Sequence, residues 1–126
     1  MLSDSIFGYR VGQYRLYKVE TRLSQVQKLG EEPVCAVYRR YRDFEWLYAI
    51  LRLRFPACII PPIPPKNALG NWYSDESEQV QKRKLGLQRF LEKASTHRLM
   101  CDSEDLKGFL TEADHAFEER KRLTQC

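Results

Sequence analysis

A proline-rich segment in the middle of the chain constrains the fold more than any other feature. From Cys58 to Lys66 the sequence reads CIIPPIPPK, with four prolines within five residues. Proline fixes φ and has no backbone N–H, so this segment can be neither an α-helix nor a central β-strand. We expect it to run as polyproline II. The isoleucines Ile59, Ile60 and Ile63 indicate that it packs against the rest of the domain.

The segments before residue 40 have the pattern of β-strands. β-Branched and aromatic residues partly alternate with charged ones in Tyr9–Val11, Tyr14–Thr21 and Val34–Tyr38, and Gly12 and Gly30 interrupt the pattern. Alternation of this kind is typical of strands with one buried face. The simplest arrangement is a three-stranded antiparallel meander.

The later segments have helical spacing instead. Apolar residues recur at intervals of three and four from about Asp43 to Arg54, where Pro56 ends the pattern. They recur again from Val80 through about Thr96, after Ser74-Asp75-Glu76 as a plausible N-cap with an acidic first turn. A shorter helix follows, with Asp102 or Ser103 as its N-cap and with continuation of its pattern through Phe117 as one alternative. We therefore expect an α+β fold, in which the meander packs against a helical subdomain and the polyproline II segment connects the first and second long helices.

Composition excludes several classes of protein. The chain has 126 residues, 43% hydrophobic and 12% aromatic, which suits one compact domain and is incompatible with disorder. The net charge of +4 favours anionic partners, but 17 acidic residues leave no concentrated basic face for a nucleic acid. The cysteines Cys35, Cys58, Cys101 and Cys126 form no C-x-x-C pair, so we expect reduced thiols and no zinc cluster.

Neither a membrane span nor an enzyme is indicated. Asp4 and Arg10 interrupt any N-terminal apolar region, and the longest apolar run is too short and too rich in proline to cross a bilayer, so a cytosolic protein is expected. Catalytic and phosphate-loop motifs are absent, and His97 and His115 lack nearby ligand partners. We expect a non-enzyme without a cofactor or a bound metal.

The densest chemical feature is the run Arg39–Phe44, RRYRDF, between the last strand and the first helix. Lys66 and Lys82-Arg83-Lys84 add two basic spots further along the chain. A guanidinium binds a phosphate through two parallel charge-assisted hydrogen bonds, and a lysine acts as a point charge for a second phosphate. With an aromatic face for the apolar side of a sugar-like ring, this combination suits a phosphorylated ring.

These motifs, in this order, resemble those of the phox-homology (PX) domains of the sorting nexins, which bind phosphoinositide headgroups. The resemblance rests on R-R-Y-x-D-F at Arg39–Phe44, P-P-x-P-x-K at Pro61–Lys66 and x-R-K-x-G-L-x-x-F at Lys82–Phe90. It implies a PX fold over residues 1–114, with residues 115–126 as a charged helical tail or a linker to a further region. Dimerisation through that further region is also implied.

The resemblance also assigns roles to single residues. Arg40 would hold the 3-phosphate, Tyr41 would stack under the inositol ring, Lys66 would bind the 1-phosphate, and Arg83 would hydrogen-bond the 4- and 5-hydroxyls. This pattern implies recognition of phosphatidylinositol 3-phosphate by a peripheral membrane protein on the cytosolic face of endosomes, in endosomal sorting and protein transport.

Further residues are assigned around this headgroup site. The residues implied to insert into the membrane are Leu69, Trp72 and Tyr73. Arg42 stands where many relatives carry a small hydroxyl residue, so either Asp43 or a backbone arrangement is expected to satisfy the first amides of the helix. Arg39 and Arg42 are candidates for additional phosphate contacts, with a strand-edge charge or simple solvation as the alternatives.

An interpretation from another functional class remains open. Pro61-x-x-Pro64-Pro65-Lys66 also fits the P-x-x-P-x-K pattern of a ligand for an SH3 domain. In that case Lys66 would serve an acidic pocket on the SH3 partner, and the chain would be a protein-interaction module.

Overall fold

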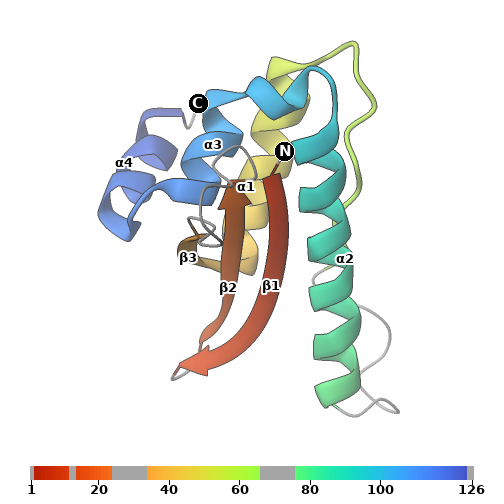
Figure 1. Ribbon diagram of the computed structural model, residues 1–126, viewed down its shortest axis with the longest axis vertical. Helices are drawn as coiled ribbons and strands as arrows, with labels where there is room; N and C mark the ends of the chain where they lie inside the picture. Colours follow the sequence, from red (N-terminus) through yellow and green to blue (C-terminus); the bar gives the residue numbers. More distant parts are fainter. Residues whose placement is uncertain (1, 12–13, 24–33, 66–75, 125–126) are drawn as a thin grey trace, which may run out of the picture.

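The computed structural model describes residues 2–11, 14–23, 34–65 and 76–124. In these ranges, β1 (Leu2–Val11), β2 (Tyr14–Leu23) and β3 (Val34–Arg40) form an antiparallel sheet in the order β1-β2-β3 (Figure 1). The helices are α1 (Tyr41–Arg54), α2 (Glu76–Thr96), α3 (Glu104–Thr111) and α4 (Asp114–Thr124), with a 3₁₀ turn at Met100–Asp102. The expected mixture of helices and antiparallel strands is confirmed.

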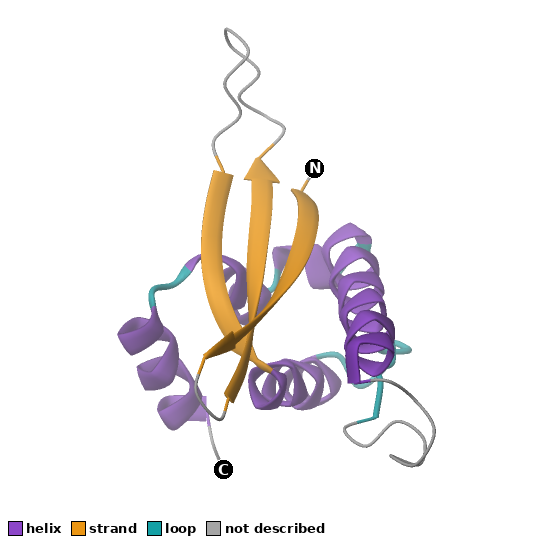
Figure 2. Ribbon diagram, turned by 90° about the horizontal axis from the view of Figure 1, so that it is seen from below, coloured by secondary structure: helices purple, strands orange, loops and turns teal. Residues whose placement is uncertain are grey.

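The helices lie on one side of the sheet. α1 and α3 contact β2 and β3, while α2 lies along β1 (Figure 1). Viewed from below, α2 and α4 lie toward opposite edges of the sheet, with α1 and α3 between them (Figure 2). The end of β3 leads directly into α1, so the junction of the two is a fixed point between the sheet and the helices.

Alternation along β2 and β3 selects which side chains face the helices. The register places Tyr17 opposite Arg39 and Val19 opposite Val37. All four side chains are buried, with exposed fractions of 6% or less. Because successive residues of a strand point to opposite faces, Arg40 leaves the sheet on the side away from Arg39.

Aromatic rings connect the layers of the core. Tyr17 of β2 meets Phe44 of α1 edge-on, and Phe44 meets Phe109 of α3 with ring centroids 4.9 Å apart. Phe109 in turn contacts Phe117 of α4 at 5.7 Å. Edge-to-face pairs of this kind add about 0.5–1.5 kcal/mol each to the effect of burial alone. The sheet and three helices are therefore joined through one continuous set of rings.

The proline-rich segment is neither helix nor strand from residue 59 to residue 65. The expectation that the segment packs against the domain is confirmed at Ile60 and Ile63, which are partly buried against the core, but Ile59 is 93% exposed and takes no part in this packing. In the polyproline II conformation expected from the sequence, which repeats every three residues, positions 60 and 63 would share one face and 59 would lie on another.

A glycine in α2 allows the proline segment to approach closely. A Cβ built on Gly86 would lie 3.0 Å from Cγ of Pro64 and 3.2 Å from its Cβ and Cδ. Glycine in a helix interior lowers helix stability by about 1 kcal/mol relative to alanine. At Gly86 the missing side chain allows the ring of Pro64 to contact the helix. The position of Pro64 thus depends on the missing side chain at residue 86.

The helix boundaries differ from those expected in two places. α1 begins at Tyr41, two residues before the expected start, and ends at Arg54 ahead of Pro56. Ser103 is confirmed as the N-cap of α3, since its hydroxyl accepts a hydrogen bond from the Leu106 N–H at 3.3 Å. The last helical pattern is divided, because Glu112 has an extended backbone and ends α3 before α4 begins.

We predict that Gly86→Leu lowers the free energy of unfolding by about 1–3 kcal/mol, because the new side chain overlaps a proline ring that is fixed to the backbone. Urea unfolding followed by circular dichroism measures the change. Gln81→Leu, at an exposed position of the same helix, is the matched control and should change stability by no more than about 0.5 kcal/mol. An equal effect of both variants would contradict this role of Gly86.

Candidate functional site

Tyr41 and Arg83, two of the residues assigned from the sequence, meet beside the proline segment. The guanidinium carbon of Arg83 on α2 lies 5.2 Å from the ring centroid of Tyr41, at the start of α1. The Tyr41 hydroxyl donates a hydrogen bond to the backbone carbonyl of Pro64. Segments that are distant in sequence are thus joined through one aromatic side chain, with a cation over its ring.

The hydroxyl of Tyr41 remains a donor in this arrangement. Burial raises the pKa of the Tyr41 phenol, the charge of Glu45 raises it further, and the charge of Arg83 opposes both. The phenol of Tyr41 therefore stays neutral to a higher pH than an ordinary tyrosine does. This keeps the hydrogen bond to Pro64, and so the aromatic ring stays fixed against the proline segment.

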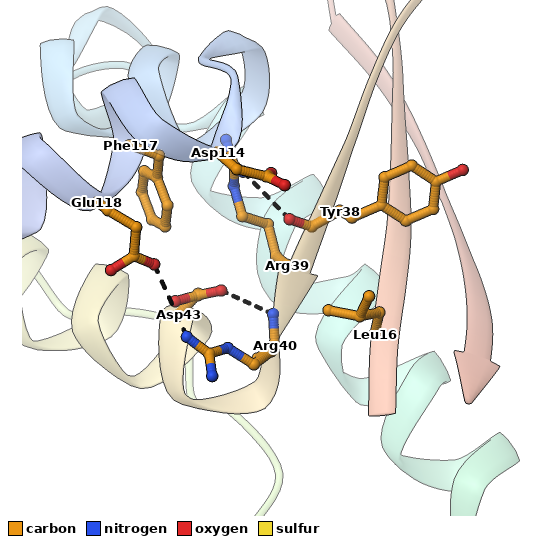
Figure 3. A pocket seen from close by; sticks show the side chains of 8 residues that line it. All are labelled: Leu16, Tyr38, Arg39, Arg40, Asp43, Asp114, Phe117 and Glu118. Carbon is orange, nitrogen blue, oxygen red and sulfur yellow. Dashed lines mark hydrogen bonds and ion pairs between the residues drawn. The ribbon is translucent and has the colours of Figure 1, made fainter. Parts of the chain in front are cut away.

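Arg40 adjoins Tyr41 in sequence, but its side chain extends toward α4. Its backbone N–H donates to Oδ2 of Asp43 at 2.7 Å, which provides the capping contact expected of Asp43. Its guanidinium Nη2 lies 3.8 Å from Oε1 of Glu118, and the side chain is 30% exposed (Figure 3). The cation is accessible to solvent while its backbone is held by the helix start.

A cavity of about 360 Å³ opens at this place. Its lining comes from the ends of β2 and β3, the first turn of α1 and one face of α4 (Figure 3). It is formed by Leu16, Tyr38, Arg39, Arg40, Asp43, Asp114, Phe117 and Glu118. Arg40 is therefore one wall of a hollow whose opposite wall carries carboxylates.

Arg39 is buried, with an exposed fraction of 1%, and the expectation of a phosphate contact or a strand-edge charge does not fit. Its Nε donates to the carbonyl of Phe109 at 2.9 Å, and its Nη2 donates to the carbonyl of Glu112 at 2.6 Å. The guanidinium carbon lies 4.0 Å from the ring centroid of Phe117.

Burial lowers the pKa of Arg39, and the nearby negative charges, that of Asp43 foremost, oppose this shift. Arg39 joins β3 to α3 and α4.

The docking of α4 was not predicted from the sequence. Lys121 of α4 donates to Oδ1 of Asp43 at 2.6 Å, and both residues are buried. Trp46 of α1 donates through Nε1 to the hydroxyl of Thr124 at 3.0 Å. Phe117, an aromatic residue in a strongly charged stretch, was the available sequence signal for this contact.

Of the remaining assigned residues, Arg42 alone lies in the described part of the chain. Arg42 is exposed on the first turn of α1, and its charge contributes to lowering the pKa of Glu118. Lys66, Leu69, Trp72 and Tyr73 lie outside the described residues.

The described part of the chain contains neither a metal-binding cluster nor a membrane-spanning helix. Within it, His, Cys, Asp and Glu form no group of three or more that could hold a metal ion, and no helix is both long and apolar enough to span a bilayer. Cys35, Cys58 and Cys101 are free thiols. His97 has a local role, since its Nδ1 accepts hydrogen bonds from the N–H groups of Leu99 and Met100.

Comparison with known proteins gives a consistent result. A family model described as the PX domain matches residues 20–113. Sorting nexin-4 of Eremothecium gossypii is 37% identical over 107 residues, which cover 82% of this chain and 26% of that protein. Vacuolar protein sorting-associated protein vps5 of Schizosaccharomyces pombe is 37% identical over 97 residues, which cover 77% of this chain and 16% of that protein. The chain thus spans about a quarter or less of these two relatives.

Solved structures give the same fold. A designed CISK-PX domain superposes with a TM-score of 0.64 at 31% identity, covering 85% of this chain and 96% of that one. The mouse SNX19 PX domain with a bound sulphate ion has a TM-score of 0.56 at 23% identity, covering 85% and 88%. The second similarity concerns the fold alone.

We predict that Arg39→Ala lowers the free energy of unfolding by about 3 kcal/mol or more, because the change leaves buried carbonyls of α3 without their charged donor. Chemical denaturation monitored by tryptophan fluorescence measures it. Arg42→Ala removes the same charge from an exposed position and should change stability by no more than about 0.5 kcal/mol. If Arg39→Ala were as mild as Arg42→Ala, the internal role of Arg39 would be disproved.

Proposed function

Because the chain belongs to the PX domain family, we propose that it is a non-enzymatic membrane-targeting module that binds phosphoinositide headgroups, with phosphatidylinositol 3-phosphate as the preferred lipid. The observation that carries the proposal is the contact between Tyr41 and Arg83 beside Pro64, with Arg40 adjacent to Tyr41 in the chain. The contact supplies an aromatic plate with a cation over it, and the residue before the plate in the chain carries a second guanidinium, which extends toward α4.

Each group has a chemical task in this proposal. Arg40 binds the 3-phosphate through charge-assisted hydrogen bonds, for which its partly exposed guanidinium is suited. Tyr41 offers its ring to the apolar face of inositol, and Arg83 donates to the 4- and 5-hydroxyls. In this proposal Arg83 lies close against the 4- and 5-hydroxyls, where the larger phosphate groups would not fit, and this favours the singly phosphorylated lipid.

Lys66 is proposed as the ligand of the 1-phosphate. It follows Pro64 by two residues, so its Cα is at most about 7 Å from that of Pro64 by chain geometry. Pro64 itself is bound by Tyr41. The tether is therefore short enough for a lysine side chain to reach a headgroup that rests on the Tyr41 ring.

The wider role is proposed from the relatives. Sorting nexin-4 and vps5 are named for sorting, and the chain matches one part of each. We propose that it recruits a larger protein to the cytosolic face of endosomal membranes as a peripheral protein, in endosomal sorting, with dimerisation supplied by a region outside this chain. A single weak headgroup contact would gain residence time from a second module in a dimer.

Presentation of a ligand to an SH3 domain is less well supported. Pro61 and Pro64 share one face of a polyproline II helix, because they are three residues apart. Pro61 is buried and Pro64 contacts α2 at Gly86. An SH3 groove would need this face, and so the segment would have to detach from its own domain first.

Arg40→Ala is expected to weaken binding to vesicles that contain phosphatidylinositol 3-phosphate by at least about tenfold, since one charge-assisted hydrogen bond contributes about 1.5–3 kcal/mol. Vesicle co-sedimentation measures the change, and Arg89→Ala, at an exposed position of α2, is the charge-matched control. Soluble inositol 1,3-bisphosphate should displace the wild-type protein. Wild-type protein that binds all anionic vesicles equally, without displacement, would refute a headgroup site.

Trp72→Ala is expected to weaken binding to the same vesicles more than binding to the soluble headgroup, because a membrane-inserted indole contributes only when a bilayer is present. Isothermal titration with soluble inositol 1,3-bisphosphate and vesicle co-sedimentation give the two affinities. Equal losses in both assays would remove the case for insertion at Trp72.

A further inference from the structure

α4 brings an acidic residue to the proposed phosphate ligand. The helix lies at 114–124, beyond the residues 20–113 that match the family model. It is nevertheless part of the domain, because Phe117 is 1% exposed and Lys121 is buried against Asp43. On the same helix, Glu118 lines the 360 Å³ cavity together with Arg40, and its Oε1 lies 3.8 Å from Nη2 of the Arg40 guanidinium (Figure 3).

The carboxylate of Glu118 is held in this position by a second cation. Nζ of Lys121 lies 2.9 Å from Oε1 of Glu118 and 2.6 Å from Oδ1 of Asp43. Lys121 is anchored at the start of α1, so Glu118 is linked to the same junction that carries Arg40. Its negative charge is therefore fixed beside the proposed site by contacts on both sides.

Glu118 is ionised under ordinary conditions. The hydrogen bond from Lys121 lowers the pKa of its carboxyl group, burial opposes this, and the charges of Lys121, Arg40 and Arg42 lower it further. A phosphate that binds Arg40 thus meets a full negative charge close to its ligand.

We propose that Glu118 is a specificity-determining residue of the headgroup site, which opposes anionic headgroups at Arg40 and does so more strongly as their charge increases. The inference rests on the function proposed above. Two effects act together. The phosphate must share Arg40 with a carboxylate, and like charges repel in proportion to the charge of the incoming group. Multiply phosphorylated headgroups are penalised most.

Glu118→Gln tests this proposal, because the amide oxygen of glutamine still accepts from Lys121 while the charge is lost. Binding is measured to vesicles with phosphatidylinositol 3-phosphate or phosphatidylinositol 3,5-bisphosphate at equal molar fraction. We expect the affinity for phosphatidylinositol 3-phosphate to rise by about threefold to tenfold, because the repulsion between the carboxylate of residue 118 and the phosphate is removed. The affinity for phosphatidylinositol 3,5-bisphosphate should rise by more. Glu119→Gln is the matched control, since Glu119 pairs with the exposed Arg122.

The outcomes separate this proposal from the function on which it rests. If the wild type binds and Glu118→Gln gives no gain, equal gains for both lipids, or the same gain as Glu119→Gln, the role of Glu118 is refuted while the headgroup site stands. If neither the wild type nor Glu118→Gln binds either lipid, both proposals fall. In an Arg40→Ala background the gain should vanish, and a gain that persists there would refute action through Arg40. Thermal unfolding confirms that the variants fold.

Discussion

The buried guanidinium of Arg39 is the interaction on which the rest of this structure depends. A charge in the interior is costly unless all of its donors are used. Here the donors are used by backbone carbonyls at the end of α3, with the ring of Phe117 against its face. The cation therefore fixes β3, α3 and α4 relative to one another. The backbone of Arg40, the next residue, is therefore also held in place at the junction with α1.

The same junction links structure to proposed function through charge balance. Asp43 accepts from the backbone of Arg40 with one oxygen and from Lys121 of α4 with the other. Lys121 in turn holds Glu118. Acidic and basic groups alternate across the junction, so the site of a proposed phosphate ligand is locally balanced although the whole chain has a charge of +4. The arrangement of charged side chains at this junction would therefore govern the affinity for anionic lipids more than the net charge of the chain does.

Much of the fold could be predicted from the sequence because it depends on local rules. Proline chemistry excluded regular structure after α1, helical spacing located α2, and residue type narrowed the N-cap of α3 to Asp102 or Ser103. The run Arg39–Phe44 located the proposed site at the end of a strand. The roles of two neighbouring arginines could not be separated, because a charged residue at a strand end is buried or exposed according to what packs on that face.

The sequence by itself determined the order of elements, the non-helical proline segment and the residue types available for binding a phosphate. Only the tertiary structure decided that Arg39 is internal, that Ile59 is exposed and that α4 returns to the β3–α1 junction with Glu118. The physical reason is distance along the chain. Periodicity and capping act over a few residues, whereas the contact of Lys121 with Asp43 joins residues 78 positions apart and forms only when the core is assembled.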